Sequence, residues 1–390
     1  MSILISLLLI FGLPLIGVAL AGLPVAPYLR LPPPVFFLNA APFSWIAFAI
    51  VAAFIALTCG PVVRRLMPTH TAAIPLTSRR PFPWWGWIAV TWTAVWWVLA
   101  WTRFDGFRPF QAHTFTPLWL GYIVIINAIT HVRTGVSLLT HRPRYLLTLF
   151  PSSSAFWWSF EYLNRFLQNW HYHGTDGFTT GEYILLASFS FSTVLPAVIS
   201  TRDLLMTFPR LRAQAANLWR VDTEHSQWIA LGMFAVAAAA MLLIGVMPNY
   251  LFPLLWMAPV LVITSVQRFA GQNTIFSRLK FGDWTPVLLP GMAALICGFF
   301  WEMWNFHSLA HWTYTVPFVN RFQVFEMPLL GYAGYLPFGL ECAAIAGWMT
   351  KAEFVGSNRP AYVEQHPLKK ATSSVTAGNE GRELTSQPAA

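Results

Sequence analysis

Residues 284–305 read WTPVLLPGMAALICGFFWEMWN, an apolar run that ends in Glu302 and Asn305. Its length is close to the ~20 apolar residues that a helix needs to cross the hydrocarbon core of a bilayer. Only a backbone that satisfies its own hydrogen bonds can cross that core, so this run predicts a membrane-spanning helix. Its end, where two polar side chains follow the apolar residues, predicts a site near the membrane surface.

The rest of the chain has the same character. The 390 residues are 56% hydrophobic and only 10% charged, with a mean hydropathy of +0.53, whereas soluble domains carry about 25% charged residues. Apolar runs occupy residues 2–22, 43–63, 84–101, 117–136, 146–165, 183–200, 227–247, 250–266, 284–304 and 327–349. We therefore predict an all-α fold, a polytopic transmembrane helical bundle of about ten spans.

The positive charges indicate an orientation. When successive loops are assigned to alternate sides, 19 of the 24 Lys and Arg residues fall on one side, and Arg30, Arg103, Arg108, Arg165 and Arg321 fall on the other. The side rich in Lys and Arg is cytoplasmic by the positive-inside rule. This predicts a multi-pass protein of the cell inner (plasma) membrane with its N-terminus and C-terminus in the cytoplasm. The basic residues are scattered between apolar runs, so we expect no nucleic-acid partner.

Two segments resemble each other within the chain. The run Glu161-Tyr162-Leu163-Asn164 matches Glu302-Met303-Trp304-Asn305 at an offset of 141, and residues 169–172 (NWHY) match 311–314 (HWTY) at an offset of 142. Residues 182–186 match 326–330 at an offset of 144. Offsets that grow slowly along the chain are typical of a duplication with small insertions. We predict a parallel internal repeat of a three-helix unit, with spans 4–6 equivalent to spans 8–10.

This repeat divides the chain into five regions. They are an N-terminal three-span region (1–112), the first repeat (113–205), a cytoplasmic loop with a linking span 7 (206–248), the second repeat (249–350) and a polar cytoplasmic tail (351–390). The tail is rich in Ser, Thr, Ala and Gly, a composition that predicts disorder.

The candidate catalytic residues are Glu161, Glu302, Asn164 and Asn305. Residues three apart share one face of a helix, so each Glu lies beside its Asn. Paired carboxylates can act as acid and base when their environments differ, and an ionisable group near the membrane core is by default a functional hypothesis. The alternative is a structural clamp, in which each Glu pairs with Arg165 or Arg321 and each Asn binds a neighbouring backbone.

Aromatic and polar residues around these four are candidate substrate-binding groups. They are Trp158, Arg165, Trp170, His171, Tyr172, Trp301, Trp304, His311, Tyr314, Arg321, Glu326 and Glu341. Glu341 follows two prolines and three glycines in residues 325–341, which predict an interrupted last span. His307 and His311 share a helix face, but Glu302 lies on another face, so we assign no metal and leave the cofactor unknown.

These features favour a membrane-embedded enzyme that acts on a lipid or isoprenoid-like substrate near the outer leaflet. Its expected partners are membrane lipids and a lipid-like small molecule. A secondary transporter or channel with coupling carboxylates is one alternative, and a structural or assembly subunit of a membrane complex is another. The familiar motifs of soluble hydrolases and nucleotide-binding enzymes are absent.

Overall fold

The computed structural model describes residues 1–31, 40–67, 80–222 and 227–349. The tail 351–390 and Arg79 therefore lie outside the described residues. The first half of the chain forms α1 (Ser2–Leu20), α2 (Ala26–Leu29), α3 (Trp45–Leu66), α4 (Trp84–Trp101), η1 (Asp105–His113), α5 (Phe115–Thr134), α6 (Leu138–His141) and α7 (Pro143–Leu167). Strand β1 (Trp170–His173) follows, and then come α8 (Thr180–Phe191), α9 (Val194–Met206) and α10 (Pro209–Ala215).

The second half continues with α11 (Gln227–Leu243), α12 (Pro248–Leu251), η2 (Phe252–Trp256), α13 (Ala258–Phe269), η3 (Leu279–Phe281) and α14 (Thr285–Asn305). It ends with β2 (His311–Tyr314), β3 (Gln323–Val324), β4 (Met327–Pro328), η4 (Leu329–Gly334) and α15 (Tyr335–Met349). The fold is mainly helical, as predicted, but it also contains two short two-stranded sheets that the all-α expectation lacked.

Each of the ten predicted apolar runs contains a helix. Six helical segments of the described residues are long and apolar enough to cross a membrane, or seven if the pair Pro248–Trp256 and Ala258–Phe269, bent by 55°, counts as one span. Helix α11 is shorter, and α4 and α7 are not among these segments. A multi-pass architecture is compatible with the structure, and the number of spans that meet this test is below ten.

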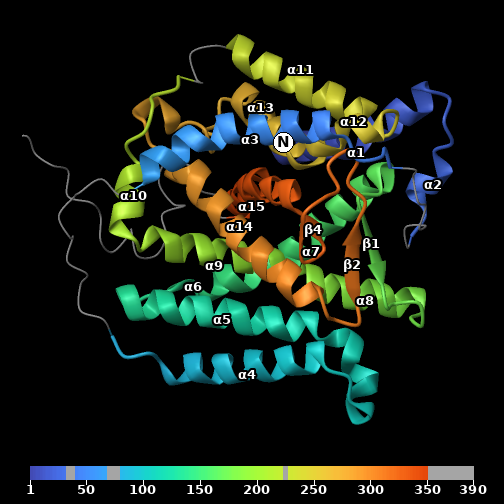
Figure 1. The fold of residues 1–390 in the computed structure, drawn as a ribbon. Helices are drawn as coiled ribbons and strands as arrows, with labels where there is room; N and C mark the ends of the chain where they lie inside the picture. The colour runs from blue at the N-terminus through green and yellow to red at the C-terminus, as the bar shows by residue number, and fades with distance from the viewer. Residues whose placement is uncertain (32–39, 68–79, 223–226, 350–390) are drawn as a thin grey trace, which may run out of the picture.

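Figure 1 shows how the helices are layered. Helices α4 and α5 form one edge of the bundle, α11 and α13 lie toward the opposite edge, and α9, α14 and α15 lie between them. Helix α14 packs on both α9 and α15, and α7 packs on α8 and α9. The largest fully buried side chains belong to Trp119, Phe160, Phe166 and Phe338. The core therefore surrounds α14, the helix formed by the run WTPVLLPGMAALICGFFWEMWN.

Helix α3 is packed differently from the central helices. None of its residues is buried, and its contacts include those with α10 and η4. It crosses in front of the bundle in Figure 1, while α10 lies at one end of the helices and the strands β1 and β2 lie toward the other end. Helix α3 therefore lies on the outside of the bundle and makes few contacts with it.

Glycines bring α14 and α15 close together, and the tightest backbone approach is at Gly339. A Cβ atom added at Gly339 would lie 2.2 Å from the carbonyl oxygen of Pro290 in α14. Since backbone cannot move aside as a flexible side chain can, only glycine allows the two helices to approach this closely.

We expect Gly339→Ala to destabilise the protein by about 1–3 kcal/mol, because the added methyl group must separate two packed helices. Thermal unfolding of the protein in nanodiscs measures the loss. Gly232→Ala is the matched control, because a Cβ at Gly232 in α11 meets nothing within 4 Å. An equal melting temperature for both variants would contradict the close packing of α14 on α15.

Candidate functional site

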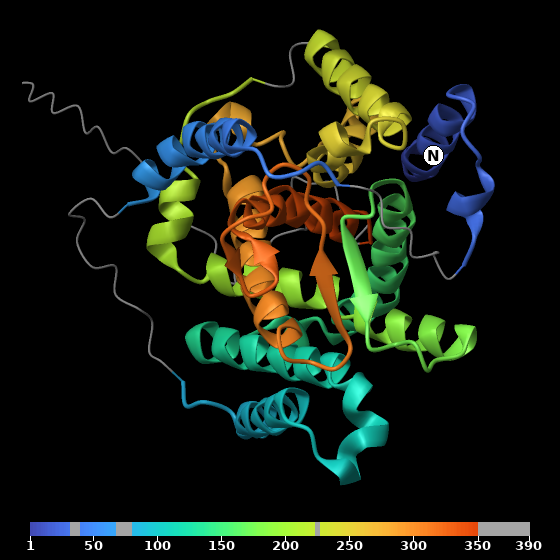
Figure 2. The same ribbon diagram turned by 45° about the vertical axis from the view of Figure 1, so that its right-hand side comes forward.

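The two Glu/Asn motifs lie at corresponding ends of α7 and α14, and each helix leads into a strand. Strands β1 and β2 pair in antiparallel fashion, with Trp170 opposite Tyr314 and Tyr172 opposite Trp312. His171 faces Thr313 at the centre of this register. Figure 2 shows the two strands side by side. The predicted outer loops are therefore joined by a small sheet that brings the two motifs into one site.

The two asparagines clamp these strands in the same way. Asn164 donates from Nδ2 to the carbonyl of Trp170 (2.9 Å) and accepts from the backbone N–H of Asn169 (2.8 Å). Asn305 donates to the carbonyl of Trp312 (2.7 Å) and accepts from the N–H of the same residue (2.7 Å). Each amide thus ties the end of its helix to the strand that follows, which agrees with the backbone contact expected of a clamp.

Glu161 accepts three hydrogen bonds on one oxygen. Its Oε1 receives the indole N–H groups of Trp157 and Trp170 (both 3.0 Å) and the hydroxyl of Tyr172 (2.7 Å). The carboxylate is buried, with 2% of its surface exposed. The partners come from α7 itself and from β1, so the strand folds back over the helix that precedes it.

Glu302 occupies the equivalent place in the second motif. Its Oε1 accepts from the hydroxyls of Tyr314 (2.7 Å) and Tyr335 (2.6 Å), and the indole of Trp312 donates to the Tyr314 oxygen (2.7 Å). Its Oε2 is buried without a hydrogen-bond partner. Both carboxylates bind aromatic donors, so the ion pairs with Arg165 and Arg321 considered for a clamp are not what holds them.

The strand tyrosines remain protonated donors. Burial raises the pKa of the Tyr172 hydroxyl, and the charge of Glu161 raises it further. Burial and the charge of Glu302 raise the pKa of the Tyr314 hydroxyl in the same order. A phenol held against a carboxylate keeps its proton because ionisation would place two negative charges side by side.

These aromatic residues form the wall of a cavity of about 490 Å³. Its other sides come from α3, α8, η2 and η4. Aromatic residues of this wall are Phe54, Phe115, Trp157, Trp170, Tyr172, Tyr183, Phe191, Phe252, Trp256, Trp301, Trp312, Tyr314 and Tyr335. Neither Glu161 nor Glu302 is among the lining residues. The carboxylates lie behind the wall. They are connected to the cavity only by hydrogen bonds to side chains that line it, such as Trp170, Tyr172 and Tyr314.

The predicted substrate-binding residues divide into two groups. Trp170, Tyr172, Trp301, His311 and Tyr314 line the cavity. Trp158, Arg165, His171, Trp304, Arg321, Glu326 and Glu341 do not line it.

The members of the second group have other neighbours. Trp158 donates to Ser188, Arg165 donates to the Tyr28 carbonyl, and Arg321 lies over the rings of Phe43 and Trp45. Trp304 packs on Trp119, and Glu326 is half-buried. His171 is buried in β1, and burial lowers its pKa.

Two histidines lie at the cavity wall. The rings of His173 and His311 stack at 5.1 Å, and His173 Nε2 contacts the Thr313 hydroxyl at 2.8 Å. Both residues line the cavity. No group of three or more His, Cys, Asp or Glu side chains in the described residues could hold a metal ion.

Sequence reasoning missed two features. Tyr335 donates to Glu302 although it lies 33 positions further along the chain, a pairing that only the fold of η4 and α15 creates. The second is the buried pair Arg202–Asp203 in α9, with a nitrogen-to-oxygen distance of 2.7 Å. The adjacent opposite charges just after the apolar run 183–200 were a signal that could have found this pair.

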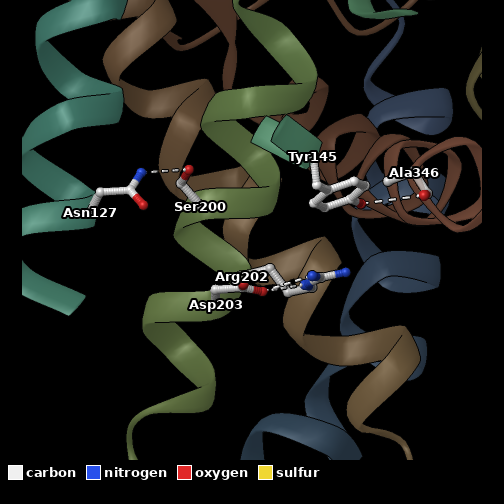
Figure 3. Close-up of polar contacts among 6 residues, drawn as sticks. All are labelled: Asn127, Tyr145, Ser200, Arg202, Asp203 and Ala346. Carbon is white, nitrogen blue, oxygen red and sulfur yellow. Dashed lines mark hydrogen bonds and ion pairs between the residues drawn. The ribbon is translucent and has the colours of Figure 1, made fainter. Parts of the chain in front are cut away.

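Figure 3 shows the surroundings of that ion pair. Asn127 of α5 donates to Ser200 of α9 (3.0 Å), and Tyr145 of α7 donates to the carbonyl of Ala346 in α15 (3.3 Å). These contacts connect helices from both halves of the chain, so we interpret this cluster as structural.

The chain was compared with protein families, curated proteins and solved structures. No family model, curated protein or solved structure matches the chain.

The clamps predict coupled stability effects. Asn164→Ala and Asn305→Ala each remove two hydrogen bonds to buried backbone, so each should cost about 2–4 kcal/mol. Because the clamped strands pair with each other, the double variant should depart from additivity by at least ~0.5 kcal/mol. Thermal or denaturant unfolding measures all three variants. Strictly additive losses would show that β1 and β2 do not hold each other in place.

Proposed function

We propose that the chain is a membrane-embedded enzyme that binds a lipid or isoprenoid-like substrate near the outer leaflet. One observation carries the proposal: an aromatic cavity is backed on two sides by buried carboxylates, each of which holds tyrosine hydroxyls of the wall. Ligand sites are typically apolar cavities with a few convergent polar groups, and this cavity has that composition.

The tyrosines give the carboxylates a route to the substrate. Tyr172, Tyr314 and Tyr335 line the cavity and donate to Glu161 or Glu302. When the phenol oxygen accepts a proton from the substrate, the phenol's own O–H proton passes to the carboxylate behind it, and the reverse transfer makes the same pair an acid. In this proposal the tyrosines touch the substrate, and Glu161 and Glu302 act through them.

The internal repeat belongs to the same proposal. Several contacts recur at an offset of 141 or 142: the Asn clamps, the Glu-to-Tyr bonds and the antiparallel register centred on His171 and Thr313. An antiparallel pair of equivalent strands has a local twofold axis, which is what a parallel repeat requires. We propose that the two halves arose by duplication and that the site lies on their common axis.

Helix α3 offers a lateral route into the cavity. Val51, Phe54, Ile55, Thr58 and Cys59 line the cavity, yet none of the residues of α3 is buried in the protein. A helix held by few contacts can move at low cost, so a lipid substrate would reach the cavity beside α3 without leaving the bilayer.

A transporter is the second candidate function, favoured by one observation. Glu341 is fully buried, and its carboxyl interacts with the backbone of Val260. It lies in α15, which follows the 3₁₀ segment η4, and near Val260 at the start of the bent α13. A buried carboxyl beside interrupted helices is a feature of coupling sites in transporters.

The orientation is proposed with ten spans and both termini in the cytoplasm of a cell with an inner membrane. Single cysteines placed near Arg212 should resist an impermeant maleimide in intact cells, whereas cysteines near Asp105, Asp176 and His307 should react. Labelling after permeabilisation is the control for accessibility. Reaction at position 212 in intact cells would reverse the orientation.

The catalytic proposal is tested by Glu161→Gln and Glu302→Gln, which keep an acceptor for the tyrosines but remove a titratable group. We expect expression of the wild-type chain to change the abundance of at least one apolar metabolite, measured by mass spectrometry of membrane extracts. Each variant should abolish that change at an unchanged melting temperature. Glu182→Gln is the control, since Glu182 is exposed and lies outside the cavity wall.

Two results would contradict the catalytic role. A fall in melting temperature, with the metabolite change retained in the remaining folded protein, would make the carboxylates structural. An unaltered metabolite profile on expression of the wild-type chain would remove the enzyme and leave a binding or transport protein.

A further inference from the structure

The cavity wall has an unusual electrostatic character. Five indole rings, of Trp157, Trp170, Trp256, Trp301 and Trp312, contribute to it. The face of an aromatic ring carries partial negative charge, and indole attracts cations most strongly. No Lys or Arg lines the cavity in the part of the chain that the structure describes.

Five donors of this wall are directed to the two carboxylates. The indole N–H groups of Trp157 and Trp170 and the hydroxyl of Tyr172 are directed to Glu161. The hydroxyls of Tyr314 and Tyr335 are directed to Glu302. A ligand at these five residues therefore meets ring faces and phenol lone pairs, with carboxylates immediately behind them.

Two buried acceptors have no partner. The Oε2 atom of Glu302 lacks a hydrogen bond, and so does the Oδ1 atom of Asn169 in the cavity wall. Glu302 is fully buried, and Asn169 is 4% exposed. A buried acceptor without a partner is costly, and a positive group in the cavity would offset part of that cost across the wall, since Glu302 does not itself line the cavity.

Basic residues nearby do not neutralise this region. Glu161 and Glu302 form no ion pair with Lys or Arg among residues 1–31, 40–67, 80–222 and 227–349. Arg165 acts on Glu161 at longer range, and its guanidinium donates to the Tyr28 carbonyl. His173 and His311 at the wall stack on each other, with ring centroids 5.1 Å apart.

We infer that the cavity selects a hydrophobic organic cation: an apolar molecule that carries a weakly hydrated positive group, such as a quaternary ammonium. The inference rests on the proposed function, since it names the class of molecule that the lipid-binding cavity takes. The apolar part would pack on α3, η2 and η4, and the cationic group would lie against the indoles and tyrosines in front of Glu161 and Glu302. The cation supplies the counter-charge that the two carboxylates lack.

The test compares three probes with the same aromatic part: benzyltrimethylammonium, its uncharged carbon isostere neopentylbenzene, and phenylmethanesulfonate. Tryptophan fluorescence of the full chain in nanodiscs reports binding. Protection of Cys59 from a membrane-permeant maleimide is a second readout, because Cys59 lines the cavity whereas Cys297 and Cys342 are buried. We expect the cation to bind at least about tenfold more tightly than the neutral isostere, and the anion not to bind.

Three variants locate the effect. Glu161→Gln and Glu302→Gln should reduce the preference for the cation to less than about threefold, while Glu182→Gln keeps it. Gly334→Leu should weaken both the cation and the neutral isostere, because a Cβ at Gly334 points to the Trp256 ring at 3.5 Å and a larger side chain fills the cavity. If the Gln variants do not fold, the comparison of probes on the wild-type chain still decides the inference.

The outcomes separate the inference from the proposed function. Equal binding of the cation and the neutral isostere, both lost in Gly334→Leu, would overturn charge selection and leave the lipid cavity intact. Tighter binding of the anion would also overturn it. Failure of every probe to bind or to protect Cys59 would overturn the cavity itself. If the cation binds more tightly than the other two probes, mass spectrometry of co-purified molecules distinguishes a lipid with a cationic headgroup from a free organic cation.

Discussion

The antiparallel pairing of Trp170–His173 with His311–Tyr314 is the constraint on which the candidate site depends. Each strand follows directly from a helix that ends in a Glu/Asn motif, and each Asn fixes the strand to that helix by two hydrogen bonds. The pairing therefore joins two helix ends that are about 140 residues apart in the chain. Without it the two motifs would lie at the ends of two helices that no strand pairing connects.

Burial of charge explains why so many aromatic residues gather here. A carboxylate removed from water needs hydrogen-bond donors, and indoles and phenols provide them with little added polarity. Tyr and Trp can thus satisfy Glu161 and Glu302 and still present apolar rings to the cavity. The same aromatic side chains stabilise the fold and form the binding surface, so removing one of these rings is expected to act on both.

The deeper Glu341 poses a different problem for the fold. Among the described residues no aromatic group donates to it, and it is fully buried in α15 beside the backbone of Val260 in α13. A carboxyl in such surroundings is stable when it holds a proton or gains a further partner in another state. A transport mechanism would require Glu341 to change its proton or its partner during the cycle, whereas the proposed enzyme mechanism does not use this residue.

Hydropathy along the chain was enough to predict a mainly helical fold with several helices apolar enough to cross a membrane, because such helices appear as long apolar runs whatever the tertiary contacts. The spacing of Glu161 with Asn164, and of Glu302 with Asn305, was enough to single out four buried residues at the ends of two helices that the paired strands connect; their catalytic role stays a prediction. The strands were missed because four residues such as Trp170–His173 carry no periodic pattern of their own. Tyr335, the cavity and the position of the carboxylates behind the aromatic wall were decided by the tertiary structure, since each depends on contacts between residues far apart in the chain, which a single sequence does not encode as a local pattern.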